Sequence, residues 1–199
     1  MQPAGTESRI TDPADFTAAF RGHFEAVYRF ICRRVGPELA EDLAADTFAT
    51  AYRRRASYQP GLGSLRSWLY GIATNVLRNH WRAERRLLEL DAQLTARVGL
   101  MANSEAADDR LIASLLAPKL AAALISLTRE QREVLLLYAW AELSHEEIAA
   151  ALQIAPGTAR SRLSRARAAL REQLGDVGLD LWISDEPRIG QTRDGSGHA

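Results

Sequence analysis

Apolar residues recur at intervals of three and four along almost the whole chain of 199 residues. This spacing places them on one face of an α-helix, whereas a half-buried strand shows strict alternation of apolar and polar residues. Alternating β-branched runs are missing from the sequence. The first clear helical stretch comprises Phe16, Phe20, Phe24, Val27, Tyr28 and Ile31. The sequence therefore predicts an all-α protein.

Proline, glycine and local composition divide the helical chain into segments. Asp12-Pro13 is expected to begin a first helix, and Gly36-Pro37 to end it and begin a second. Ser64 is expected to cap a third helix that ends near Arg86. Further helices are expected at 119–126, 129–141, 144–152 and 156–174.

The predicted architecture is two small helical domains joined by a flexible linker, and the C-terminal domain is a helix-turn-helix. Residues 87–117 hold five acids and two arginines and lack strong periodicity, which is typical of a linker. The segments are a disordered N-terminus at 1–11, a first domain at 12–86, an acidic linker at 87–117, a second domain at 118–174 and a C-terminal tail at 175–199.

The formal net charge is zero, but the charges are segregated along the chain. Residues 53–86 hold eight arginines and one acid, Glu84, and residues 156–171 hold five arginines and no acid. The acids gather in residues 38–46 and 89–109. Two basic blocks separated by an acidic stretch favour a nucleic-acid binder.

Composition and motifs also argue against several other classes of protein. The single cysteine, Cys32, excludes an internal disulfide, and no cysteine–histidine cluster has zinc spacing. His145-Glu146-Glu147 resembles the start of a zinc-protease helix, but Ala149 stands where the second histidine belongs. No N-terminal leader is recognisable, and the longest apolar stretches are interrupted by Pro118 and Lys119. We expect a cytoplasmic protein with no membrane contact of its own, no cofactor, no metal and no enzyme activity.

The strongest local signal is a helix-turn-helix between residues 143 and 170. Ser144 and Glu147 form a capping box, Gln153-Ile154-Ala155 makes the turn, and Pro156 starts the second helix. That helix carries a narrow apolar stripe of Ala159, Leu163, Ala166 and Leu170, with hydroxyls and arginines elsewhere. Such a helix suits the major groove of DNA. The alternative is a solvated face of a bundle helix, but acids that would pair with the arginines are absent until Glu172.

The third predicted helix is basic and aromatic. It combines Trp68, Tyr70 and Trp81 with asparagines and arginines, a combination that suits single-stranded DNA with unstacked bases. For Trp68 simple core packing is the preferred reading. Asn75 and Arg78 have no equally simple structural explanation.

Both halves resemble the bacterial RNA polymerase sigma factors of the extracytoplasmic-function (ECF) class. Segments 127–137, 142–149 and 157–163 (LTREQREVLLL, ELSHEEIA and GTARSRL) are similar to conserved region 4. Segments 41–48 and 67–75 (EDLAADTF and SWLYGIATN) are similar to conserved region 2. The resemblance covers residues 13–174. It departs at Gln153, where the turn usually has glycine, and at Ala159, where valine is usual.

The resemblance implies a promoter-recognition protein that binds core RNA polymerase and promoter DNA and is held inactive by an anti-sigma protein. In this family region 2 reads and melts the −10 element and region 4 reads the −35 element. The implied −10 residues are Tyr58, Gln59, Asn75, Arg78, Asn79, Arg82 and Arg85. The implied −35 residues are Thr158, Arg160, Ser161, Arg162 and Arg165. The implied core polymerase contacts are Glu41, Asp42, Asp46 and Phe48.

Two other classes remain open from the residues alone. A stand-alone helix-turn-helix repressor or activator with an N-terminal dimerisation domain explains the C-terminal half equally well, but not the basic aromatic helix or the acidic helix before it. A pure protein-interaction module explains neither basic block. Binding of core polymerase discriminates between the sigma factor and the repressor.

Overall fold

The structure is a computed structural model that describes residues 12–95 and 118–174. The predicted N-terminal segment, the C-terminal tail and residues 96–117 of the predicted linker lie outside these residues. The first described part contains α1 (Pro13–Val35), α2 (Pro37–Arg54), two short 3-10 turns (Arg55–Ser57 and Pro60–Leu62) and α3 (Leu65–Thr95). The second contains α5 (Pro118–Ile125), α6 (Arg129–Ala141), α7 (His145–Leu152) and α8 (Pro156–Leu174). Within these ranges there is no strand, which confirms the all-α prediction.

Local signals set the helix boundaries at the predicted places. The carboxylate of Asp12 accepts a hydrogen bond from the backbone N–H of Ala14 at 2.9 Å and caps α1. Gly36 separates α1 from α2 with φ +77°, a backbone conformation that glycine adopts without strain. The Ser64 hydroxyl accepts from the N–H of Ser67 at 3.1 Å and caps α3.

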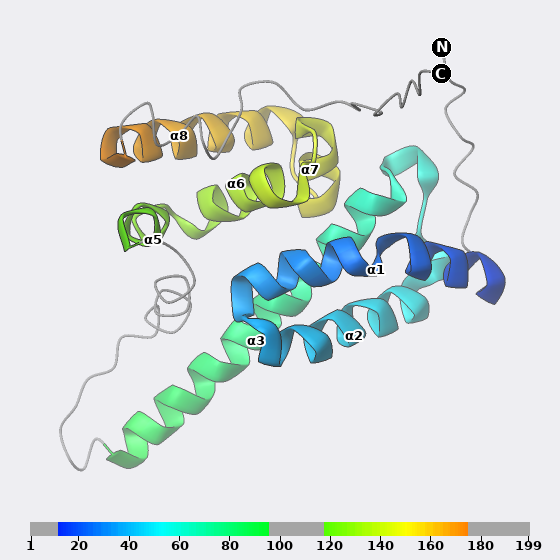
Figure 1. Cartoon of the computed structure of the whole chain (residues 1–199), viewed down its shortest axis with the longest axis horizontal. Helices are drawn as coiled ribbons and strands as arrows, with labels where there is room; N and C mark the ends of the chain where they lie inside the picture. The colour runs from blue at the N-terminus through cyan, green and yellow to red at the C-terminus, as the bar shows by residue number, and fades with distance from the viewer. Residues whose placement is uncertain (1–11, 96–117, 175–199) are drawn as a thin grey trace, which may run out of the picture.

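The predicted end of the third helix near Arg86 is wrong, because α3 continues to Thr95. Residues 87–95 read LLELDAQLT and contain neither proline nor glycine. Leucine, glutamate, glutamine and alanine are strong helix formers, so nothing in this stretch stops the helix. Figure 1 shows the end of α3 projecting beyond the other helices.

The first three helices enclose one part of the core. α1 and α2 run antiparallel beside each other, and α3 packs against both (Figure 1). Their buried faces meet through Phe30 and Ile31 of α1, Leu43 of α2, and Leu69 and Leu77 of α3, each at most 7% exposed. The buried residues Val27 and Ile31 of α1 lie four positions apart, as do Leu69, Ala73 and Leu77 of α3, in agreement with the apolar spacing of the sequence.

The last four helices form the second part of the core. α8 packs on α5, α6 and α7, and the buried residues include Leu135 of α6, Ile148 of α7, and Leu163 and Leu170 of α8. The two parts also touch, because α7 packs against α3 and α6 against α1. The buried residues of both parts join into one continuous cluster.

Candidate nucleic-acid interface

The helix-turn-helix is built from α7 and α8. The Ser144 hydroxyl accepts from the N–H of Glu147 at 3.1 Å, and the Glu147 carboxylate accepts from the N–H of Ser144 at 3.0 Å, which confirms the capping box. Gln153 follows α7 in the left-handed region with φ +55°. Because related turns usually have glycine here, the glutamine occupies a strained backbone position. The N–H of Ile154 then donates to the carbonyl of Ala149 at 3.0 Å and closes the turn.

α8 has a buried stripe and a basic outer face. Ala159, Leu163, Ala166 and Leu170 are at most 1% exposed. On the outer face Arg160 and Arg165 are exposed, and Thr158, Ser161 and Arg162 are half-buried. The guanidinium of Arg160 lies 3.9 Å from the Glu146 carboxylate, but both side chains are about two-thirds exposed, so this pair contributes little to stability.

Arg167 belongs to the fold rather than to this face. Its guanidinium lies over the ring of Tyr138, 4.6 Å from the ring centroid, a cation–π contact that ties α8 to α6. The structure therefore brings all five predicted −35 residues to the first half of α8, where a recognition helix contacts base edges.

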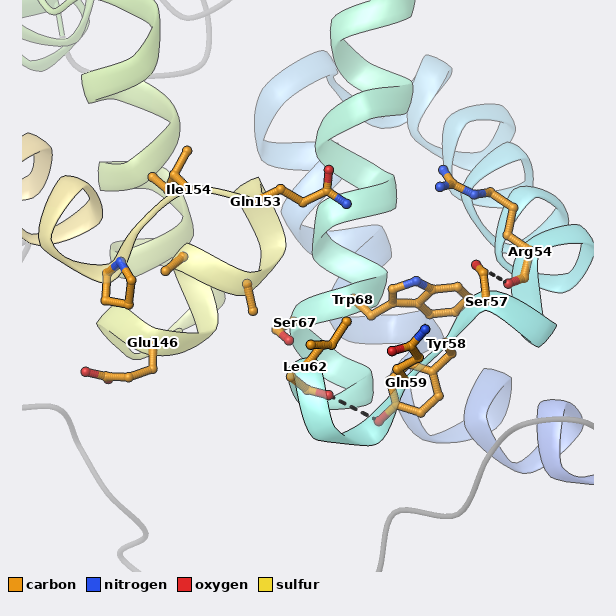
Figure 2. Close-up of a pocket in the computed structure, with 14 residues that line it drawn as sticks. Arg54, Ser57, Tyr58, Gln59, Leu62, Ser67, Trp68, Glu146, Gln153 and Ile154 are labelled. Carbon is orange, nitrogen blue, oxygen red and sulfur yellow. Dashed lines mark hydrogen bonds between the residues drawn. The ribbon is translucent and has the colours of Figure 1, made fainter.

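The loop between α2 and α3 borders a cavity of about 520 Å³ (Figure 2). Tyr58 is 3% exposed, its hydroxyl donates to the carbonyl of Gly63 at 3.4 Å, and its ring centroid lies 5.4 Å from that of the half-buried Trp68. Gln59 is exposed at the edge of the cavity. Tyr58 thus anchors the loop to α3, while the neighbouring Gln59 is exposed to solvent.

The opposite wall of the cavity comes from the helix-turn-helix. Glu146 of α7 and Gln153 and Ile154 of the turn line this wall, and the Gln153 side chain extends toward α3 (Figure 2). Sequence reasoning did not predict that the two domains share a cavity, because the residues on its two walls are about eighty or more positions apart in the chain.

α3 carries the polar part of the predicted −10 set. Asn75, Asn79 and Arg82 are exposed, and Arg82 donates to the Asn79 side-chain carbonyl at 3.2 Å. The side chain of Arg85 lies outside the part of the chain that the structure describes. Amide side chains can donate and accept hydrogen bonds at once, as base edges do.

Arg78 differs from the exposed −10 residues predicted on α3 because its side chain forms an ion pair. Its Nε donates to Oε1 of Glu133 in α6 at 2.7 Å, and its Nη2 donates to the second carboxylate oxygen. The Glu133 side chain is 4% exposed and also lies 3.3 Å from Arg129. This bidentate geometry is the strongest that an arginine and a carboxylate can form.

The ion pair shifts the titration of both groups. Burial alone raises the pKa of the Glu133 carboxyl, but the hydrogen bond and charge of Arg78, helped by Arg34 and Arg129, outweigh burial and lower that pKa below its ordinary 4.5. The hydrogen bond that Arg78 donates to Glu133 raises the pKa of Arg78. Both groups are therefore charged in the folded protein.

The predicted polymerase contacts divide between the surface and the core. Glu41, Asp42 and Asp46 are exposed on α2 and form an acidic face. Phe48 is 4% exposed, and its ring centroid lies 4.9 Å from that of Phe20 and 5.6 Å from that of Phe24. Phe48 thus anchors α2 to α1 beneath the acids.

Other kinds of site find no support in residues 12–95 and 118–174. No group of three histidine, cysteine, aspartate or glutamate side chains there is arranged to hold a metal ion. Within the same ranges no helix combines the length and the apolar character needed to cross a membrane.

Comparison with known proteins identifies the family. Residues 19–87 match Sigma-70 region 2, and residues 118–170 match Sigma-70 region 4. The RNA polymerase sigma factor CarQ of Myxococcus xanthus is 35% identical over 167 residues, which cover 83% of this chain and 92% of CarQ. The ECF RNA polymerase sigma factor SigW of Bacillus subtilis is 31% identical over 160 residues, 77% of this chain and 85% of SigW.

A solved structure supports the same assignment. The sigma factor RpoE of Bartonella quintana, crystallised in complex with the anti-sigma factor NepR, superimposes with a TM-score of 0.55 at 28% identity, covering 80% of this chain and 96% of that one. Two sigma regions in the family's order, together with relatives aligned over most of their length, show that this chain belongs to the ECF family of RNA polymerase sigma factors.

Proposed function

We propose that this sigma factor binds core RNA polymerase through the acidic face of α2 and reads promoters with α3 and α8. The observation that carries the proposal is the separation of charge on the surface. Exposed acids lie on the first ten residues of α2, while exposed arginines lie on α3 and α8 and exposed asparagines on α3. A chain with one acidic and two basic faces suits a basic protein partner and two stretches of DNA.

For the −35 element, the reading surface is Thr158, Arg160, Ser161, Arg162 and Arg165 on α8. Arginine can donate two hydrogen bonds to a guanine edge, and each such base contact gives about 1–3 kcal/mol of discrimination. The serine and threonine side chains are short, so they let the helix approach the groove closely. Exposure of Arg160 and Arg165 supports this role.

For the −10 element, the reading surface is Tyr58, Gln59, Asn75, Arg78, Asn79, Arg82 and Arg85. Gln59, Asn75 and Asn79 are exposed and offer amides to base edges. The buried Tyr58 acts indirectly, by holding the loop that carries Gln59. Arginines along α3 attract the phosphates of a single strand.

For the polymerase, Glu41, Asp42 and Asp46 present negative charge to the basic coiled coil of the clamp, and Phe48 holds their helix in place.

The chain acts by binding, and the polymerase supplies catalysis, so we assign no enzymatic role to the chain itself. Its place of action is the cytoplasm, where the polymerase and the promoters are.

An anti-sigma protein is the proposed inhibitor. The fold relative RpoE of Bartonella quintana was crystallised with the anti-sigma factor NepR. We propose a partner of the same kind here, one that covers both DNA-reading faces. Co-purification of this chain from cells of its source tests the proposal, and recovery without any bound protein would contradict it.

The test of the main proposal separates the two kinds of binding. Wild-type protein should comigrate one-to-one with sigma-free core polymerase in size-exclusion chromatography and support promoter-specific transcription. Arg162→Ala should lower that transcription about tenfold, since about 1.4 kcal/mol corresponds to a factor of ten, and leave comigration intact. Asp42→Asn with Asp46→Asn should weaken comigration and, with it, lower transcription.

Two results would contradict this division. If Arg162→Ala abolished comigration, the −35 surface would not be separate from the polymerase surface. If the folded wild-type chain failed to bind polymerase at all, a stand-alone helix-turn-helix repressor would be the better interpretation.

A further inference from the structure

The cavity between the α2–α3 loop and the helix-turn-helix has the size of a small-molecule site (Figure 2). Its volume is about 520 Å³, and clefts that hold small molecules commonly measure about 300–1,000 Å³. Such clefts combine an apolar lining with a few polar groups that orient the ligand. Here Trp68, Leu62 and Ile154 supply apolar surface, and polar side chains enter from both walls.

Leu62 leaves apolar surface open to water at this cavity. It is 73% exposed, whereas the other exposed large apolar residues of the described chain, Phe20, Leu39 and Tyr52, are 38–40% exposed. A 3-10 turn fixes its place, because its backbone N–H donates to the carbonyl of Gln59 at 2.9 Å. A ligand that covers Leu62 removes this surface from water, which favours binding.

Backbone strain at Gln153 points to the same cavity. Gln153 is one of the two non-glycine residues with positive φ in the described ranges. Glycine adopts that conformation without strain. Strained residues of this kind cluster at ligand-binding sites, where the side chain that they carry has a use. The Gln153 side chain lines the cavity and extends toward α3 (Figure 2), so the strained position places an amide there.

A second amide and an aromatic ring come from the opposite wall. Gln59 is exposed and lines the cavity beside the anchored Tyr58. Each amide side chain carries N–H donors and a carbonyl acceptor. Two amides on opposite walls can therefore satisfy both donors and acceptors on the edge of a heterocyclic ring. The half-buried Trp68 offers the indole surface on which such a ring can stack.

The charged side chains of the lining stand on opposite walls. Arg54 ends α2, and Glu146 lies in the first turn of α7 (Figure 2). A guanidinium can bind a phosphate through two hydrogen bonds, and a carboxylate accepts hydrogen bonds from hydroxyl or amino groups. A free amino acid carries both its charged groups on one carbon atom, whereas a nucleotide holds its phosphate and the polar edge of its base far apart. The separated charges therefore favour a nucleotide.

We propose that this cavity binds a free purine nucleotide. The base stacks on Trp68 and presents its polar edge to Gln59 and Gln153, and the phosphate binds Arg54. A purine has two fused rings and therefore a larger face for stacking than a pyrimidine. The site requires no promoter-reading role for α3, so its test is independent of the proposed function.

Isothermal titration calorimetry of the full chain with AMP and GMP tests the site. At least one of the two should bind saturably and one-to-one. The matching nucleoside lacks the phosphate and should bind about tenfold more weakly, because a charge-assisted hydrogen bond is lost. No saturable binding of either nucleotide to the folded wild-type chain would overturn the proposal.

Two neighbouring arginines separate the phosphate contact from general surface charge. Arg54→Ala should weaken nucleotide binding about tenfold and leave nucleoside binding unchanged. Arg53→Ala is the matched control, because Arg53 is also exposed but donates to the Thr50 hydroxyl at 2.9 Å within α2. It should change neither affinity. Equal losses of nucleotide affinity in the two variants would overturn the site.

Gln153→Gly separates ligand contact from stability. It relieves the strained backbone, so the melting temperature should not fall, yet nucleotide affinity should drop by about threefold to tenfold with the loss of a hydrogen bond. An unchanged affinity would overturn the role of Gln153 and, with it, the proposed ligand geometry.

Competition decides the chemical class of the ligand. Inorganic phosphate carries only the anionic part of a nucleotide, and L-tryptophan carries an aromatic ring with the two charges of an amino acid. Neither should displace the bound nucleotide at equal concentration. Displacement by phosphate would indicate a plain anion site, and displacement by L-tryptophan an amino-acid site. Either result would overturn the nucleotide assignment.

Discussion

Replacement of Gln153 by glycine should stabilise the protein. Gln153 ends α7 with φ +55° and ψ +46°, and a non-glycine residue in this left-handed region costs roughly 1–2 kcal/mol. Glycine removes that strain but loses about 0.5–1 kcal/mol more backbone entropy on folding. The relief is the larger of the two effects, so we expect a net gain of about 0.5–1 kcal/mol in the free energy of unfolding.

The side chain itself contributes little to this balance because Gln153 is exposed at the rim of the cavity. Gln153→Ala is therefore the control, since it removes the side chain but keeps a Cβ at the positive φ. Calorimetry of the full chain should show a Tm about 1–4 °C higher for Gln153→Gly and no increase for Gln153→Ala. A Tm for Gln153→Gly equal to or below that of wild type would refute the assignment of strain to this turn.

Two further predictions concern helix α7 and the interdomain ion pair. Ser144→Ala removes the capping hydroxyl of α7 and should lower the free energy of unfolding by about 1 kcal/mol in urea denaturation; the exposed Ser164→Ala of α8 is the control, and equal losses would contradict the capping role. The pKa of Glu133 lies below its ordinary 4.5 in the folded protein, so its ion pair stabilises the fold above that pH and loses its contribution as acid protonates the carboxylate. Wild-type stability should therefore fall more steeply than that of Glu133→Gln below pH 4.5, and parallel pH profiles would count against a folded-state ion pair.

Much of the helical layout was predictable because the signals are local. A helix boundary depends on backbone groups within one turn of it, and the residues that satisfy them are adjacent in sequence. Asp12, Gly36, Ser64 and the Ser144–Glu147 box therefore mark boundaries that the structure confirms. The same local logic failed at Arg86, where the drop in apolar periodicity was interpreted as an end although the residues that follow favour a helix.

The candidate site was predictable only in part. The exposed arginines of α8 follow from the sequence because its buried stripe fixes which side faces out. For Tyr58 and Phe48 the sequence suggested surface contacts, but both side chains are buried. Aromatic residues suit a core and a binding surface equally well, so residue type alone does not distinguish the two.

The sequence by itself determined the helical class, most helix boundaries and the family, because these depend on local spacing and on motifs. Only the tertiary structure decided that Arg78 pairs with Glu133, 55 positions away, and that Gly71 lies against Ala151. Such contacts depend on how two folded domains dock, and docking is set by the shape and charge of whole surfaces. The partners of a surface arginine therefore become visible only once its neighbours in space are known.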